Sequence, residues 1–229
     1  MGKQEQERQD KYETIYRLLL EQYGQPEWRP HLPPVDELVS TILSQNTNDT
    51  NRDRAFERLQ KRFSDWEAVL AAPEDEIVEA IRPAGLANQK APRIHGALEQ
   101  ILEERGEISL DFLAEMPLNE AREWLTDIKG VGPKTAAIVL LFAFNRPVFP
   151  VDTHVHRVSR RLGLIADSLS AEKAHQALAD LAEPDHYYSL HLNLIRHGRE
   201  ICTARKPKCE RCFLSAHCRY YRENRTGDA

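Results

Sequence analysis

Four cysteines near the C-terminus carry the most distinctive chemistry of this 229-residue chain. They are spaced C-x6-C-x2-C-x5-C and are the only cysteines present: Cys202, Cys209, Cys212 and Cys218. The first ten residues are polar and charged, which disfavours the disulfides of a secreted protein. Structural zinc usually takes two CxxC-type pairs, and here only Cys209 and Cys212 form one. Compact, staggered thiolates favour a [4Fe–4S] cluster, with zinc as the remaining alternative.

A glycine-rich turn at residues 128–133 predicts a helix–hairpin–helix. Gly130 suits the left-handed cap of a short preceding helix, Gly132 allows a tight reversal, and Pro133 favours the start of a second helix. Such a turn directs main-chain N–H groups toward a phosphate oxygen, assisted by the positive end of the second helix. The alternative is an ordinary turn between two helices.

Lys134 falls in the first turn of that second helix, where a cation is electrostatically unfavourable. Its position indicates that the amine has a task. The helix end and partial burial both favour the neutral, nucleophilic form, which can attack C1′ of a deoxyribose and form a Schiff base. The alternative is a lysine that contacts a phosphate.

Asp152 lies two residues after Pro150 and shortly before an expected helix at residues 154–162. An aspartate in that position is commonly an N-cap. It is also a candidate carboxylate beside Lys134, where it would stabilise positive charge at C1′ or assist proton transfer. The residues alone leave both roles open.

The elements that position these residues are predicted to be helices. Apolar side chains recur three and four apart along most of the chain, and no convincing alternating strand appears. We therefore expect an all-α fold. Prolines between residues 26 and 34 predict a stiff connector, and Pro147 and Pro150 mark a break after Phe144. No stretch approaches the length of a membrane span.

The charge is unevenly distributed along a chain whose formal net charge is −5. Residues 65–123 carry 14 acidic and 5 basic residues, whereas residues 129–161 carry 6 basic and 1 acidic, and residues 196–225 carry 9 basic and 3 acidic. Each basic segment alone is compatible with a solvated helix face. Two such segments, each holding one of the motifs above, indicate a polyanionic partner.

The hairpin, the segments 151–154 and 197–202 and the cysteine loop together resemble the endonuclease III family of DNA glycosylases. These proteins belong to the helix–hairpin–helix–Gly/Pro–Asp superfamily, and the resemblance spans roughly residues 34–220. It implies two helical lobes with a DNA-binding groove between them. Residues 35–146 would form the lobe with the hairpin. Residues 1–34 and 147–229 would form the lobe in which the four cysteines hold a [4Fe–4S] cluster.

The resemblance also implies roles for single residues. Lys134 matches the Schiff-base lysine and Asp152 the essential aspartate of the family. Gln45 matches the residue that fills the gap left by a flipped nucleotide. Leu86 matches the wedge that enters the opposite stack, with a core leucine as the alternative. The expected DNA-binding residues are Gln45, Leu86, Gly130, Gly132, Arg205, Lys206 and Lys208.

The implied activity is that of a bifunctional DNA glycosylase and AP lyase that removes oxidised or reduced pyrimidines through a lysine Schiff base and β-elimination. Its partner would be double-stranded DNA with damaged bases or abasic sites. We expect a monomer in the bacterial or archaeal cytoplasm, associated with the nucleoid and not with a membrane. Two other classes remain: a damage-binding protein with weak or no lyase activity, and a zinc-containing helical DNA-binding protein.

Three features depart from the bacterial pattern of the family. Extra residues lie around 108–119, Pro133 stands where an arginine is usual, and the overall charge is acidic. Each bears on DNA affinity more than on chemistry. Relatives that excise adenine opposite an oxidised guanine lack the lysine and carry a glutamate in the helix before the Gln45 turn. Here Lys134 is present and residues 38–42 contain no glutamate, which disfavours that specificity.

Overall fold

A computed structural model describes residues 2–225, and within that range the chain is helical, with no strand. The prediction of an all-α fold is confirmed. The α-helices are α1 (Lys3–Tyr23), α2 (Pro34–Ser44), α3 (Asp49–Arg62), α4 (Trp66–Ala71), α5 (Glu74–Ile81), α6 (Ala87–Arg105), α7 (Leu118–Asp127), α8 (Pro133–Phe144), α9 (Thr153–Leu162), α10 (Ala171–Ala179), α11 (Tyr187–Glu200) and α12 (Arg219–Arg225). Short 3-10 helices are η1 (Arg82–Ala84), η2 (Asp111–Ala114), η3 (Pro184–His186), η4 (Cys209–Arg211) and η5 (Ser215–His217).

The chain divides into two compact units. One comprises residues 29–146, and the other combines residues 1–28 with residues 147–229. None of the described helices is both long enough and apolar enough to cross a membrane.

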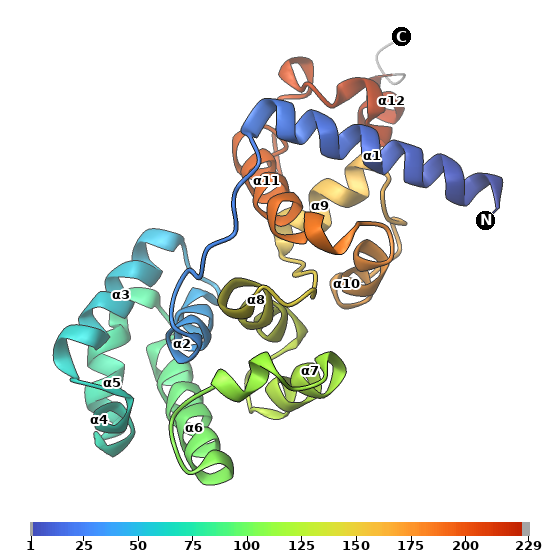
Figure 1. Cartoon of the computed structure of the whole chain (residues 1–229). Coiled ribbons are helices and arrows are strands. Elements are labelled where there is room, and N and C mark those ends of the chain that lie inside the picture. The colour runs from blue at the N-terminus through green and yellow to red at the C-terminus, as the bar shows by residue number, and fades with distance from the viewer. Residues whose placement is uncertain (1, 226–229) are drawn as a thin grey trace. The chain divides into compact units, whose positions relative to one another are not determined.

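Helix α8 is the centre of the unit formed by residues 29–146. Its sequence after Thr135 is almost entirely apolar, and helices that are apolar on every side are normally buried. It packs against α2 and α7, as Figure 1 shows. Val139, Leu140 and Leu141 are at most 2% exposed. The helix that starts at Pro133 is therefore held by packing against both α2 and α7.

Helices α3, α5 and α6 complete this unit around α2, with η1 lying against α3. Side chains at the helix starts satisfy main-chain N–H groups there. Asn48 accepts a hydrogen bond from the Asn51 amide (2.9 Å), and Asp65 accepts one from the Ala68 amide (2.7 Å). These caps set where the loops before α3 and α4 end.

The additional residues around 108–119 form an ordered segment of this unit. The chain makes the short helix η2 and then enters α7. Arg146 donates to the carbonyl oxygens of Leu113 and Met116, both at 2.6 Å. A single guanidinium thus satisfies main-chain acceptors of a stretch that has no long helix of its own.

The second unit is built around the packing of α9 against α11. The two helices approach closely at Gly198, where an added Cβ would lie 3.0 Å from His154 Cβ. Helix α1 covers α11 with a buried stripe that includes Tyr12, Ile15 and Leu19 (Figure 1). The N-terminal helix therefore completes the core of the unit that holds the cysteine loop.

Candidate functional site

The hairpin between α7 and α8 is a five-residue turn. Helix α7 ends at Asp127, Ile128 is extended and buried, and the Val131 amide donates to the Ile128 carbonyl at 2.9 Å. Gly130 has a φ of +92°, which a residue with a side chain rarely adopts. The prediction that Gly130 caps the preceding helix is wrong. It reverses the chain inside the turn, because α7 already ends at Asp127 and the backbone is extended at Ile128.

Gly132 is the N-cap of α8 and offers no side-chain acceptor to the amides of the first turn. It is exposed, and a Cβ added there would meet nothing within 4 Å. Uncapped amides at a helix N-terminus attract an anion. Lys134, the second residue of α8, is half-buried, and its amine forms no hydrogen bond with any residue in the described range. The hairpin thus presents free amides and a free amine together.

Gln45 lies against this hairpin. Its Nε2 donates to the Gly130 carbonyl at 3.3 Å, and its Oε1 accepts from Arg93 Nη1 at 2.7 Å. A Cβ added at Gly130 would lie 2.9 Å from Arg93 Cδ, so the glycine also makes room for the arginine stem. The structure therefore brings Gln45, Gly130 and Arg93 together. Arg93 was missed by sequence reasoning, since no motif surrounds it.

Leu86 is 47% exposed, and within residues 2–225 it is the one large apolar side chain that is exposed. Its φ is +51°, and Gly85 before it has a φ of +67°. The alternative of a core leucine is wrong. A leucine held in the left-handed region is strained, and such strain concentrates at binding and catalytic positions. Leu86 also borders an open depression together with Val78, Arg82 and Gln89.

Asp152 is the N-cap of α9, and its Oδ1 accepts a hydrogen bond from the Val155 amide at 2.7 Å. The carboxylate is half-buried. Capping uses one oxygen and orients the other, so the cap and a chemical role are compatible. Asp152 belongs to the second unit, whereas Lys134 belongs to the first.

Two arginines of α9 connect the helix that Asp152 starts to the cysteine loop. Arg157 donates from Nε to the Cys202 carbonyl (3.1 Å) and from Nη2 to the Gly198 carbonyl (2.9 Å). Arg161 donates from Nη1 to Cys202 Sγ (3.3 Å) and to the Thr203 carbonyl (2.8 Å). Sequence reasoning missed both arginines, although their i,i+4 spacing on one helix face was visible.

All four cysteines line one cavity. Its remaining wall is largely apolar and includes Val158, Leu162 and Ile201. His197 lies between the cavity and the N-terminal helix, with Nε2 3.6 Å from Cys212 Sγ and Nδ1 3.2 Å from the Tyr23 hydroxyl. Burial raises the pKa of Cys212 to about 11, so a metal must displace the thiol proton on binding. Four thiolate donors around one enclosed, mostly apolar space suit an iron–sulfur cluster.

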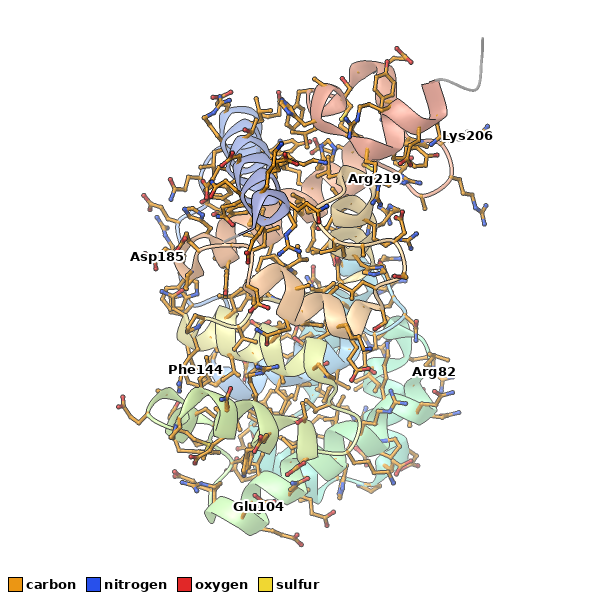
Figure 2. The ribbon with its side chains drawn as sticks, turned by 90° about the vertical axis from the view of Figure 1, so that its right-hand side faces the viewer. Arg82, Glu104, Phe144, Asp185, Lys206 and Arg219 are labelled. Carbon is orange, nitrogen blue, oxygen red and sulfur yellow. The ribbon has the colours of Figure 1, made fainter. Side chains whose placement is uncertain are left out.

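The basic residues of the cysteine loop differ in how they are held. Arg205 and Lys206 are exposed, and Figure 2 shows Lys206 extending from the loop at the surface. The Lys208 amine donates to the Glu200 carbonyl at 2.9 Å, at the end of α11. The Thr203 hydroxyl donates to the Lys206 carbonyl at 2.7 Å and closes the loop. All three cations are exposed, and Lys208 differs in that one of its N–H groups also supports the loop.

Two family models match the chain. The model of HhH-GPD superfamily base excision DNA repair proteins matches residues 39–184. The model of the iron–sulfur binding domain of endonuclease III matches residues 202–218, which begin and end at the outer two cysteines.

Known proteins are similar over most of the chain. Endonuclease III of Sulfolobus acidocaldarius is 36% identical over 189 residues, covering 82% of each chain. Endonuclease III of Thermotoga maritima is 35% identical over 195 residues, covering 85% of this chain and 87% of its own. A trapped covalent endonuclease III–DNA intermediate matches with a TM-score of 0.78 and 28% identity, covering 94% of this chain and 98% of its own.

Proposed function

Because the chain belongs to the endonuclease III family of HhH-GPD base excision DNA repair proteins, we propose that it both removes oxidised or reduced pyrimidines and cuts the strand with Lys134. The protein is a DNA glycosylase with a [4Fe–4S] cluster held by the cysteine loop. The class of lesion that it removes, the cleavage of the strand and the role of each residue are proposed. We also propose that it acts as a monomer in the cytoplasm.

The observation that carries the proposal is the unpaired Lys134 amine at the uncapped start of α8. The positive end of the helix dipole does not stabilise a lysine placed there, so the position has no structural advantage. The same helix end, through its free amides, binds the phosphate that flanks the reacting nucleotide. The start of α8 then both binds the phosphate and carries the nucleophile. The amine reaches C1′ when the nucleotide is flipped out.

In the proposed reaction, the Lys134 amine attacks C1′ of the damaged nucleotide. The bond between C1′ and the base breaks, and the base leaves with its bonding electrons and takes up a proton. The bond between C1′ and the ring oxygen then breaks, that oxygen takes the proton lost by the amine, and C1′ and Nζ are joined as a protonated imine. The imine acidifies the C2′ proton. Loss of that proton and breakage of the bond between C3′ and its oxygen complete β-elimination and cut the strand on the 3′ side.

Asp152 would act on the charge that develops at the sugar. Its Oδ1 accepts the hydrogen bond from the Val155 amide, and this contact orients the carboxylate and so directs the second oxygen. A preoriented carboxylate stabilises a positive C1′ without reorganisation during the reaction. It also accepts or returns a proton during imine formation.

The remaining predicted residues would hold the DNA. The hairpin amides near Gly130 and Gly132, with Arg205 and Lys206, would bind phosphates irrespective of sequence. Gln45 and Leu86 would occupy the space opened by the flipped nucleotide and the stack opposite. Lys208 would contribute through the shape of the loop. When bound, the cluster supplies iron–thiolate bonds that fix this loop, and no chemical step passes through it.

Lys134→Gln tests the proposal directly. Glutamine keeps much of the bulk and has no nucleophilic amine, so borohydride trapping and strand cleavage should be abolished while duplex binding stays within about threefold. Lys129→Gln is the matched control, because Lys129 is an exposed lysine of the same turn. It should retain trapping. Cleavage by Lys134→Gln at the rate of the unmodified protein would disprove the Schiff-base role.

Asp152→Asn tests the second residue, because asparagine retains the ability to cap α9. Excision should fall by about 100-fold or more, with binding and thermal stability nearly unchanged. Incubation with oligonucleotides that carry different oxidised or reduced bases, followed by sizing of the products, identifies the lesion class. A protein that binds lesions but forms no borohydride-trapped imine would instead be a damage-binding protein.

A further inference from the structure

Lys90, on α6, is a lysine with only 1% of its surface exposed. Lysines are almost never fully buried without a partner. The partners here are two main-chain carbonyls: Nζ donates to Leu43 at 2.7 Å and to Ala84 at 2.9 Å. Neither the sequence motifs nor the proposed chemistry assigns this side chain a task.

The two carbonyls occupy equivalent places, each at the end of a helix just before a functional side chain. Leu43 lies in the last turn of α2, two residues before Gln45. Ala84 ends η1, two residues before Leu86. Carbonyls at helix ends lack intrahelical partners and carry partial negative charge, so a buried ammonium satisfies both. One amine thereby connects the Gln45 loop, which follows α2, to the Leu86 loop, which precedes α6. Gln45 and Leu86 are the two residues expected to enter the duplex.

Helix α6 also holds each of these residues more directly. The amides of Gln89 and Lys90 donate to the Leu86 carbonyl at 2.9 and 3.0 Å, which fixes the left-handed leucine at the helix start. Arg93 is three residues beyond Lys90, on the same face of the helix, and donates to the Gln45 side chain. Both loops are therefore anchored to one helix.

We propose that Lys90 is a positioning residue, which sets the spacing between the Gln45 loop and the Leu86 loop so that both side chains enter the opened duplex together. This inference rests on the proposed function. Extraction of a nucleotide costs unstacking and unpairing energy. Side chains that fill the gap and the opposite stack together offset part of that cost. Loops already held at the right separation lose less conformational freedom when they bind.

Lys90→Met tests this role, since methionine has similar length but neither charge nor donor. Single-turnover excision from a lesion-containing duplex should fall at least 30-fold. Borohydride trapping on a single-stranded oligonucleotide with an abasic site, where no stack is opened, should stay within threefold of the unmodified protein. Lys61→Met, which removes an exposed lysine of the same unit, should leave both values unchanged.

A double variant tests whether Lys90 acts through the wedge. If it does, Leu86→Ala combined with Lys90→Met should be no slower on duplex than the slower single variant. Multiplying effects would overturn the inference. So would an equal loss on duplex and single strand, or a duplex rate at the level of the unmodified protein.

Lys90→Gln provides the same comparison if the methionine variant does not fold, because its amide still satisfies one carbonyl. It should show a smaller loss, again confined to the duplex. Lys134→Gln measured in parallel separates the two hypotheses. Trapping that survives in Lys134→Gln would disprove the proposed function. If trapping is abolished in Lys134→Gln while Lys90→Gln excises from duplex at the normal rate, only the role of Lys90 is disproved.

Discussion

Residues 29–146 hold their functional side chains with an apolar core and buried main-chain contacts, whereas the other unit relies on arginines and a cysteine loop. In the first unit, α8 is buried by α2 and α7, and Lys90 satisfies the carbonyls of two loops. In the second, Arg157 and Arg161 connect α9 to Cys202 and the residues after it. Both arrangements fix loops, but with different means.

The difference follows from how much apolar surface each loop can bury. The loops of the first unit lie on a core with fully buried residues such as Leu38 and Ile42. Between Cys202 and Cys218, Leu214 is the one large aliphatic side chain that is buried. A segment with so little apolar burial needs other contacts to offset the entropy of ordering it. Iron–thiolate bonds and arginine hydrogen bonds supply these.

The sharpest way to break this comparison is to remove one of the four cysteines proposed to hold the cluster. Cys212→Ser should cost folded protein, with hydrogen exchange rising across residues 147–225 much more than across residues 29–146. Leu38→Ala is the counterpart in the first unit and should destabilise by about 3 kcal/mol with the cluster absorbance retained. A colourless Cys212→Ser protein that is soluble and fully active would show the cluster to be dispensable for both units.

The candidate site residues that the sequence alone picks out are those whose types and spacing are local. The four cysteines fall within residues 202–218, and the hairpin glycines directly precede Lys134. The endonuclease III resemblance built on them is confirmed by the family models and relatives. The all-α fold followed from helical periodicity, because nearly every helix buries one apolar face.

Three of the residues that were missed, Lys90, Arg157 and Arg161, hold distant main-chain carbonyls. Lys90 and Leu43 are 47 positions apart, and Arg157 and Cys202 are 45 apart. A carbonyl is present at every position, so no pattern of residue types marks the one that accepts. Lys208 shows the converse. Its basic character predicted a phosphate contact, and its exposed amine also donates to the Glu200 carbonyl at the end of α11, which no sequence pattern marks.

Within the first unit, a pair of glycine variants separates backbone strain from contact with DNA. Gly130→Ala should destabilise by about 2 kcal/mol, because the residue has a φ of +92° and an added Cβ would meet Arg93. Gly132→Ala should leave thermal stability nearly unchanged, since its φ is −97° and the space is open. It should weaken duplex binding by crowding the phosphate. Equal melting temperatures for the two variants would contradict this division.

In the second unit, the salt dependence of binding tests which cations of the cysteine loop meet phosphates. Changing both Arg205 and Lys206 to serine should flatten the slope of log K against log salt by about 2, at about 0.9 per phosphate. Lys208→Ser should change that slope by less than about 0.5, because its amine is bound to Glu200. Lesion preference should survive in all variants. A slope unchanged in the double variant would move the binding surface to the hairpin.

The smallest expected effect concerns pH and belongs to Lys90. Burial, assisted by the nearby charge of Arg93, lowers the pKa of Lys90 to about 8 from an ordinary value of 10.5. Its other contacts in α2 and η1 are carbonyls. Between these two pKa values the unfolded chain binds a proton that the folded chain does not. The free energy of unfolding should therefore rise with pH in that window, by at most about 1.4 kcal/mol for each pH unit.

Urea unfolding of the protein and of Lys90→Met at pH 8.5 and pH 9.5 isolates this contribution, because other groups titrate alike in both. The stability of the unmodified protein relative to the variant should increase between the two values. Below pH 8 both states hold the proton, and the relative stability should level off at its lowest. A charged amine kept buried at such a cost is poor evidence for stabilisation and better evidence for a task in the folded protein. A relative stability that falls from pH 8.5 to 9.5 would mean that the folded protein prefers the charged amine, and the carbonyl contacts would then stabilise the fold outright.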